Sequence, residues 1–146
     1  MIIIGEKKKG IKYDFRETCF GICYKDNKIY LTEKRKEIYL TGGGIENGES
    51  DEECLKREFI EEAGLEITKV KKLCDIDCFW YTRDKKNMES LTHIYIVKTA
   101  EHINLPLEKE SKLIKMSLHE AKAVLELPYQ KRALEEFEKY LKAKYS

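Results

Sequence analysis

Proline, long apolar runs and net charge are all scarce in this chain of 146 residues. Only 2 prolines occur, whereas 42% of the residues are hydrophobic and 38% are charged. This balance excludes collagenous, low-complexity and disordered chains. No apolar run approaches the roughly 20 residues that a membrane-spanning helix needs, and the apolar start at residues 2–4 is too short for the core of a signal peptide. We therefore expect a cytoplasmic protein that makes no membrane contact.

The charges almost cancel, because 28 lysines and arginines face 27 aspartates and glutamates and leave a net charge of +1. A global basic field is absent, so any electrostatic function must be local, and long nucleic acid is not expected as a partner. The length is that of one domain with its own hydrophobic core. Since there are no repeats, linkers or breaks in composition, residues 1–146 are expected to form a single domain.

Five cysteines, an odd number, argue against a closed disulfide framework. Two pairs, Cys19 with Cys23 and Cys74 with Cys78, have a spacing that suggests a four-thiolate zinc site as one alternative. Both pairs lie in strand-like apolar runs, where residues four apart are about 13 Å from each other. One metal ion cannot bind both members of such a pair, so we expect reduced cysteines in the core.

The order of hydrophobic patterns predicts an α/β fold in which a mixed β-sheet is flanked by helices. A turn at residues 25–27 joins the first two strands into a hairpin. Residues 41–44, Thr-Gly-Gly-Gly, predict a loop before the central helix. The expected strands are residues 18–24, 28–33, 67–81, 91–99 and 112–116, with a short apolar piece at 38–40, and the expected helices are residues 51–63, 118–125 and 128–144.

The central helix has well-marked ends. Ser50 is a favourable N-cap, and Glu53 three residues later completes a capping box. Gly64 stands where a left-handed C-cap is expected. The acids of the first turn, residues 51–53, are favoured there by the helix dipole and need no other explanation.

Three later acids, Glu58, Glu61 and Glu62, lie near the negative end of the helix dipole, where carboxylates are disfavoured. At about 100° per residue they share one arc at the edge of the apolar stripe. Because like charges four residues apart repel, a hard divalent cation is a fitting counter-charge. The plainer reading is a solvated acidic face that Lys56 and Arg57 partly neutralise. The adjacent glycine cluster favours a metal–phosphate site, since backbone without side chains can approach a ligand closely.

Residues 43–65 carry the spacing G-x5-E-x7-R-E-U-x-E-E-x-G-U, in which U is a bulky apolar residue. Gly43 is followed after five residues by Glu49, and after seven more by the segment from Arg57 to Leu65. This pattern resembles the signature of the Nudix hydrolases, and every fixed position is filled. Thr41 departs from the family, which commonly has proline just before the double glycine. The departure leaves the chemistry in place but makes the substrate subclass harder to infer.

The resemblance implies a Nudix-type α/β/α sandwich and a hydrolase that cleaves a diphosphate linked to another moiety, usually a nucleoside. It also implies Mg²⁺ or Mn²⁺ as the cofactor. The metal ligands would be Glu58, Glu61 and Glu62, joined by a backbone carbonyl of Gly42 or Gly43. Bound metal polarises phosphoryl oxygens and lowers the pKa of an attacking water, which suits a polyphosphate substrate.

Two further roles follow from the resemblance. Glu49 and Arg57 would form an ion pair that positions the glycine segment against the helix and tunes the charge of the catalytic site. The general base would be Glu61, although some members of the family use a glutamate on a later loop. Glu108 and Glu110 are the candidates for that alternative.

Substrate contacts are expected on two segments near the motif. Arg35, with Lys34, follows the second strand and would suit a bidentate contact with phosphate; a solvated turn charge is the alternative. Gly43 and Gly44 are candidates for close backbone approach to the substrate.

Outside the motif, the aromatic run at residues 79–81 offers either a stacking surface for a base or core packing. By strand alternation, the second aromatic of this run points away from the other two. Residues 83–87 predict a hairpin loop that either closes over substrate or is plainly solvated. His93 and His102 are expected to be structural or solvent-facing, because no second metal motif joins them.

The expected partner is a small nucleotide substrate, including a modified nucleoside triphosphate, and a homodimer is compatible with the family. Two alternatives remain. The first is a catalytically silent Nudix-like domain that binds or senses a nucleotide, and the second is an acidic-helix interaction protein without metal. Neither the nucleotide derivative nor the number of metal ions follows from the sequence.

Overall fold

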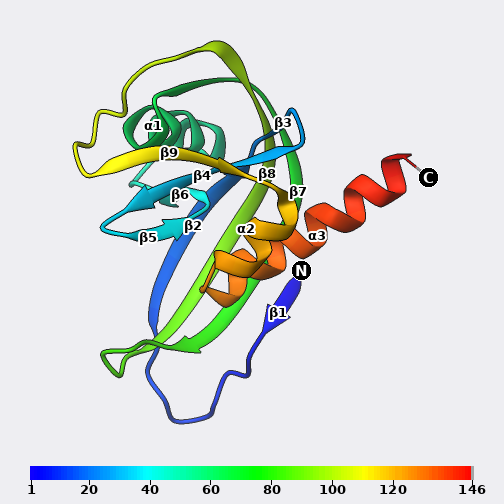
Figure 1. Cartoon of the computed structure of the whole chain (residues 1–146). Helices are drawn as coiled ribbons and strands as arrows, with labels where there is room; N and C mark the ends of the chain where they lie inside the picture. The colour runs from blue at the N-terminus through cyan, green and yellow to red at the C-terminus, as the bar shows by residue number, and fades with distance from the viewer. Residues whose placement is uncertain (146) are drawn as a thin grey trace.

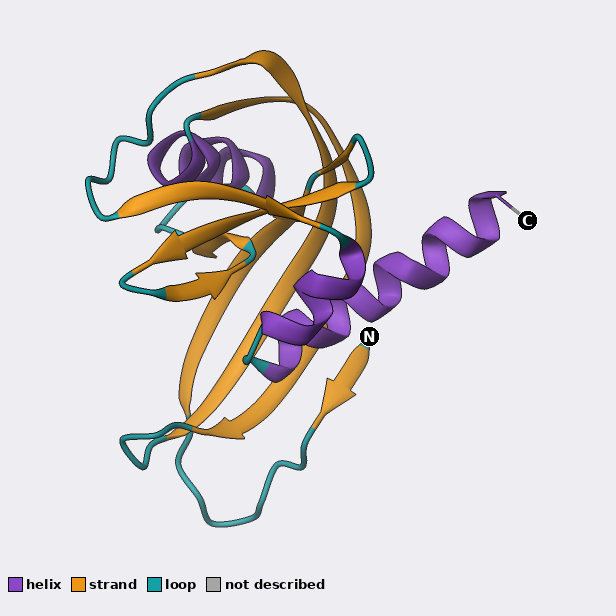
Figure 2. Ribbon diagram, viewed as in Figure 1, coloured by secondary structure: helices purple, strands orange, loops and turns teal. Residues whose placement is uncertain are grey.

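The computed structural model describes residues 1–145, which form two β-sheets and three helices (Figure 1). In chain order the elements are β1 (Ile2–Ile4), β2 (Asp14–Ile22), β3 (Tyr24–Lys25), β4 (Lys28–Lys34), β5 (Glu37–Tyr39), β6 (Thr41–Gly44), α1 (Asp51–Ala63), β7 (Leu65–Tyr81), β8 (Asn87–Ile103), β9 (Ser111–Met116), α2 (Leu118–Val124) and α3 (Pro128–Tyr145). Figure 2 shows that the last turns of α3 project away from the strands.

The larger sheet has the strand order β1-β7-β8-β2-β6. β7 and β8 form a long antiparallel hairpin, β2 runs parallel to β8, and β1 runs parallel to β7. The smaller sheet is centred on β4, which pairs antiparallel with β3, β5 and β9. The predicted mixed sheet is therefore confirmed, and its division into two sheets is an addition from the structure.

Two apolar cores lie on opposite faces of the larger sheet. Alternation along β8 sends Ile94 to one face and Val97 to the other. Ile94 packs with Phe137 of α3, whereas Val97 packs with Phe59 of α1. Because helices cover both faces, the predicted α/β/α sandwich is confirmed.

The glycine cluster at residues 41–44 is a strand, so the predicted loop is wrong. β6 pairs antiparallel with β2, and Cys19 lies opposite Gly43. Gly42 has a φ of 152°, and a Cβ atom there would lie 2.1 Å from the carbonyl oxygen of Cys19. Glycine is therefore needed for close strand pairing, whereas sequence reasoning took it as the usual mark of a loop.

The helix predictions agree with the structure within a residue or so, but several strands are longer than predicted. β7 and β8 have 17 residues each. β1 and residues 14–17 of β2 were not predicted. These segments are short or polar and mostly exposed, so they carry no clear alternating signal.

The expectation of reduced core cysteines is confirmed, because all five are free and four of them are buried. Within residues 1–145, no group of three histidine, cysteine or acidic side chains is arranged to hold a metal ion as it stands. None of the helices in the described part of the chain combines the length and the apolar character that crossing a membrane requires.

Candidate active site

The C-terminal half of α1 carries the three predicted acids. The capping box of Ser50 and Glu53 is formed, so the start of the helix is held as predicted. Glu58 and Glu62 are only 8% and 9% exposed, whereas the side chain of Glu61 is 33% exposed. Burial of two carboxylates this close in sequence is costly unless they are paired, so a simple solvated acidic face does not describe this region.

Strand β6 lies directly against the buried carboxylates. The backbone N–H of Gly42 donates to Oε1 of Glu62 at 3.1 Å. A Cβ atom on Gly43 would lie 2.8 Å from Oε1 of Glu58, closer than any ordinary contact. The glycine strand therefore brings backbone without side chains against both acids.

Arg57 connects this strand, the following loop and the helix. Its Nε and Nη2 donate to the two carboxylate oxygens of Glu49 at 2.7 and 2.9 Å, so the ion pair is bidentate. Nη1 donates to Glu58 at 2.7 Å, and Nη2 also donates to the carbonyl of Gly44 at 3.1 Å. The guanidinium holds the pKa of Glu49 down at about 2, because its hydrogen bonds favour the charged carboxylate.

Lys34, at the end of β4, is the second cation of the site. Its Nζ donates to Oε2 of Glu108 at 2.6 Å and lies 4.0 Å from Oε2 of Glu62. Glu110 instead pairs with Arg35, and both side chains are well exposed. Of the two later acids considered as a base, the structure therefore brings Glu108 beside the carboxylate cluster and leaves Glu110 outside it.

Burial raises the pKa of Glu62 to about 8 and also raises that of Glu58 above its ordinary value, because the charged form loses hydration. An all-oxygen donor set at the edge of a helix fits a hard divalent cation such as Mg²⁺ or Mn²⁺. In residues 1–145 these side chains do not yet converge as a metal-binding group. The carboxylates face Arg57 and Lys34 instead, so a bound ion would compete with these cations.

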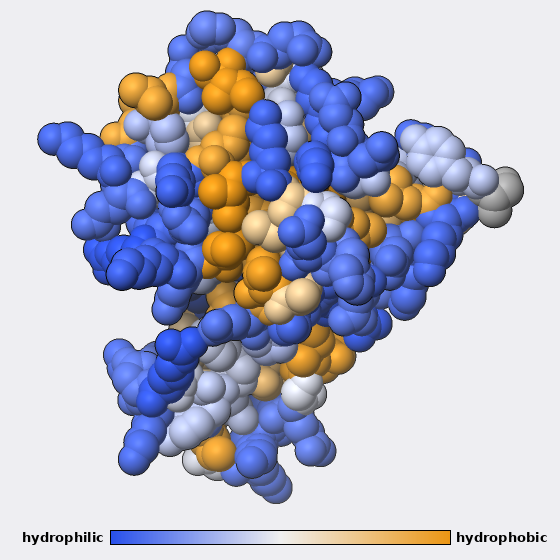
Figure 3. Space-filling model, viewed as in Figure 1, coloured by the Kyte–Doolittle hydropathy of each residue, from blue (hydrophilic) through white to orange (hydrophobic). Residues whose placement is uncertain are grey.

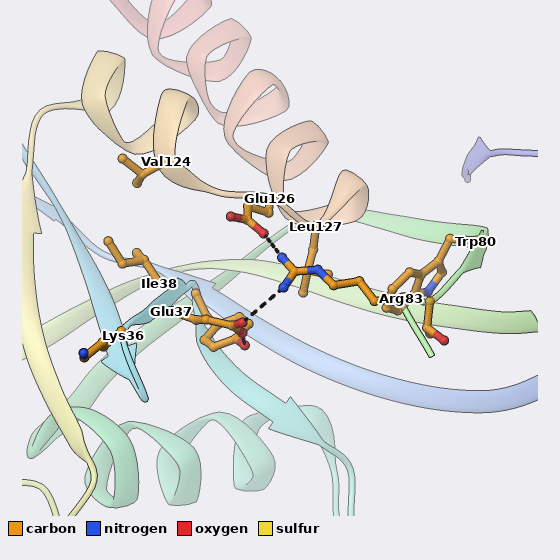
Figure 4. Close-up of a pocket in the computed structure, with 10 residues that line it drawn as sticks. Lys36, Glu37, Ile38, Trp80, Arg83, Val124, Glu126 and Leu127 are labelled. Atoms are coloured by element: carbon orange, nitrogen blue, oxygen red, sulfur yellow. Dashed lines mark hydrogen bonds and ion pairs between the residues drawn. The ribbon is translucent and has the colours of Figure 1, made fainter. Parts of the chain in front are cut away.

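A cleft leads from Lys34 toward a second pocket. It is lined by Lys34, Arg35, Glu37 and Tyr39. Glu37 and Tyr39 also line a neighbouring pocket of about 300 Å³, which lies between β5, the β7–β8 turn and the α2–α3 connection (Figure 4). Burial and the hydrogen bond to Glu37 raise the pKa of Tyr39 to about 12, so its hydroxyl remains a neutral donor.

Arg83 crosses this second pocket. Its guanidinium lies 2.5 Å from Glu126 and 3.8 Å from Glu37, as the dashed lines of Figure 4 show. These side chains are largely exposed, so the bridge contributes little stability and does not lock the pocket. Trp80 forms part of the wall, and its Nε1 donates to Ser90 at 2.9 Å, which fixes the ring.

Sequence reasoning did not find this second pocket. The prediction that Trp80 points away from its aromatic neighbours agrees with the structure, because Trp80 contacts the ring of Tyr129 while Phe79 packs edge-on against Tyr13. The sequence places Arg83 only within a predicted hairpin loop. No local pattern connects it with Glu126, which is 43 residues away in the chain.

The α/β/α sandwich, with the motif of residues 43–65 on β6 and α1, is the fold class of the Nudix-type hydrolases. The family model described as the NUDIX domain matches residues 16–139. The chain therefore belongs to the Nudix family.

Two curated relatives show how far the similarity extends. The chain is 28% identical over 145 residues to a probable DHNTP pyrophosphohydrolase of Lactococcus lactis, covering 95% of this chain and 79% of the relative. It is 44% identical over 61 residues to an ADP-ribose pyrophosphatase of Methanocaldococcus jannaschii, covering 38% of this chain and 36% of the relative.

Solved structures agree on the fold. A MutT protein from Methanosarcina mazei superimposes with a TM-score of 0.70 at 15% identity, over 91% of this chain and 99% of the other. The E. coli ORF135 protein superimposes with a TM-score of 0.69 at 22% identity, over 90% and 94%. At these identities the likeness establishes the architecture alone.

Proposed function

We propose that this chain hydrolyses the diphosphate linkage of a small nucleotide derivative with Mg²⁺ or Mn²⁺ as cofactor. The observation that carries the proposal is the burial of Glu58 and Glu62 against the side-chain-free strand at Gly43. The names of the two curated relatives support the reaction, since one is a probable DHNTP pyrophosphohydrolase and the other an ADP-ribose pyrophosphatase.

Glu58 and Glu62 would be the main metal ligands, with a carbonyl of Gly42 or Gly43 as a further ligand and Glu61 at the edge of the site. When bound, the metal would polarise phosphoryl oxygens and acidify a water. Removing the metal with a chelator should therefore abolish activity.

The cations of the site would position the glycine strand and the substrate phosphates. Arg57, through its two bonds to Glu49, would keep the glycine strand and its following loop against α1. Lys34 and Arg35 line the cleft that leads away from the carboxylates and would bind substrate phosphate, as would the backbone at Gly43 and Gly44.

Glu61 is the proposed general base, because its side chain is the most exposed of the three motif acids. Glu108 remains the alternative, since Lys34 holds it beside Glu62 and its backbone N–H donates to the carbonyl of Glu61 at 2.9 Å. Comparison of Glu61→Gln with Glu108→Gln by pH–rate profile separates them, because loss of the base removes the acidic limb of the profile.

The moiety beyond the phosphates would occupy the pocket that Arg83 crosses. This pocket offers the flat ring of Trp80, the Tyr39 hydroxyl and the acceptor oxygens of Glu37 and Glu126. A heterocycle that carries N–H donors fits this set, because carboxylate oxygens accept such bonds.

The test is hydrolysis of a panel of nucleotides with Mg²⁺, followed by identification of the phosphate products. Glu62→Gln should lower turnover at least about a hundredfold and leave the fold intact, because the neutral amide is cheaper to bury. Glu66→Gln, an exposed acid just outside the helix, is the matched control. Equal rates in wild type and Glu62→Gln would refute the metal assignment. Nucleotide binding without turnover would favour the silent sensor domain.

A further inference from the structure

A groove separate from the catalytic site lies on the face of the larger sheet opposite α1. The last turns of α3 diverge from β7 and β8 there, leaving a space of about 400 Å³. Lys69, Lys71 and Lys98 border it from the sheet, and Tyr140 and Lys144 border it from the helix. We call this space the lysine groove. Figure 3 shows hydrophobic residues along the projecting helix, with hydrophilic residues beside them.

The sheet side of the lysine groove concentrates like charge. Lys69 and Lys98 are directly opposite each other in the β7–β8 ladder, a pairing that is unfavourable for two positive charges. Lys71 lies two residues further along β7, on the same face. All three are exposed, and no aspartate or glutamate is among the described residues that line the groove. The fold therefore presents a concave positive surface that its own lining does not neutralise.

Aromatic rings lie between these charges. The Nζ of Lys71 is 5.0 Å from the ring centroid of Tyr140. That of Lys144 is 5.9 Å from the same ring and 5.7 Å from the ring of Tyr145, which is 76% exposed. The ring of Phe137 stacks on that of Tyr140. A ligand with both anionic groups and flat rings would meet a partner for each.

We propose that the lysine groove binds single-stranded nucleic acid, with the lysines on backbone phosphates and the tyrosine rings against unpaired bases. Positive grooves that carry aromatic side chains are the general solution for such strands. Lys69 and Lys71 are about 6.6 Å apart along β7, too far to share adjacent phosphates of one diphosphate but suited to successive phosphodiesters.

Other anionic partners fit less well. A duplex keeps its bases stacked inside, so the tyrosine rings would have no role. A membrane surface is flat and cannot enter a concave groove. The net charge of +1 predicts no long nucleic acid partner, but that sum hides this local field, because the neutralising acids lie elsewhere on the molecule.

The test uses fluorescence anisotropy with a labelled oligothymidylate of about 12 nucleotides and the full chain. Binding should weaken with salt with a log–log slope of about −2, since each of three single-strand phosphates contributes about −0.7. The triple variant Lys69→Gln/Lys71→Gln/Lys98→Gln should weaken binding at least about tenfold and flatten this slope.

The matched control is Lys7→Gln/Lys8→Gln/Lys9→Gln, which removes the same charge from exposed lysines outside the groove. It should change affinity by less than about twofold. Tyr140→Leu removes a ring without changing charge and should weaken binding of the strand while leaving the salt slope in place. Circular dichroism checks that each variant is folded.

The proposal is overturned if wild type shows no saturable binding, if both triple variants lose affinity equally, or if a blunt duplex or an anionic phosphatidylserine vesicle binds more tightly than the strand. Its fate is separate from that of the hydrolase site. Glu62→Gln should bind the oligonucleotide like wild type, and the groove triple variant should hydrolyse small nucleotides at the wild-type rate.

Discussion

Two regions of this molecule gather like charges and treat them in opposite ways. Around α1 two carboxylates are buried, and each meets a donor: Glu58 meets Arg57, and Glu62 meets the Gly42 amide with Lys34 nearby. In the lysine groove the charges are exposed, and none of the described residues that line it is an acid. A net charge near zero can therefore be the sum of two strong local fields of opposite sign. Burial decides which of them the protein must neutralise itself, because an unpaired charge is far more costly inside than at the surface.

Adding one methyl group at Gly43 tests how closely the buried carboxylates pack against the glycine strand. Gly43→Ala places a Cβ atom 2.8 Å from Oε1 of Glu58, so the carboxylate or the strand must move. A displacement of about 1 Å costs roughly a hundredfold in rate, and we expect a loss of that order in kcat for the best substrate of the nucleotide panel.

Gly44→Ala is the control on the same strand. Its Cβ atom would meet only the end of the Arg16 side chain, at 3.3 Å, which can swing away. We expect less than about a twofold change in kcat, with the loss of phosphate contact at Gly44 seen as a higher KM. If both substitutions slow the reaction equally, close approach of the backbone to Glu58 is not what the site requires.

A third cluster of charges, around His93, is also paired within the fold, and its contribution to stability can be tested by changing the pH. His93 is held between Asp75 and Glu17, with each ring nitrogen 2.6 Å from a carboxylate oxygen. Both contacts are hydrogen bonds only if both nitrogens carry protons. Burial acts to lower the pKa of His93, but the bonds to Asp75 and Glu17 prevail and raise it above 6.5.

A raised histidine pKa stabilises the fold fully below the unfolded-state value of about 6.5, and this contribution is lost as the pH rises through the folded-state value. The free energy of unfolding, measured in urea, should therefore fall in wild type as the pH rises above about 6.5. His93→Gln should lack most of this fall, whereas His119→Gln, at an exposed position on α2, should keep it. A profile in His93→Gln that matches wild type would show that the imidazolium makes no such contribution.

What could be predicted from the sequence follows the range of the interactions. The ends of α1 and the ion pair of Glu49 with Arg57 are local, because caps and motif spacing act within a few residues. The edge strand at Gly42 could not be predicted, since its conformation depends on pairing with Phe20 of β2, which is 22 residues away in the chain.

The charged surfaces outside the motif show the same limit. Arg83 and Glu126 meet only because the β7–β8 turn lies beside the α2–α3 connection. Lys69 faces Lys98 because irregularities in β7 at Ile67 shift the register of the ladder, and a one-residue slip would send the side chain to the other face. Composition records how many lysines there are, whereas strand register decides which of them meet.

A substitution at Lys98, which has the smallest expected effect, tests whether the charges of the lysine groove destabilise the fold. Lys98→Glu replaces a repulsive cross-strand pair with an attractive one opposite Lys69, so the free energy of unfolding should rise by about 0.2–1 kcal/mol. The free energy of unfolding of Lys98→Gln, which only removes the charge, should lie between those of wild type and Lys98→Glu. Urea midpoints at low salt measure the difference, and it should shrink at high salt because exposed charges are screened. A less stable Lys98→Glu would mean that the lysines do not repel each other. A more stable Lys98→Glu would mean that the positive charges of the lysine groove lower the stability of the fold. The buried carboxylates around α1, in contrast, are neutralised by their neighbours.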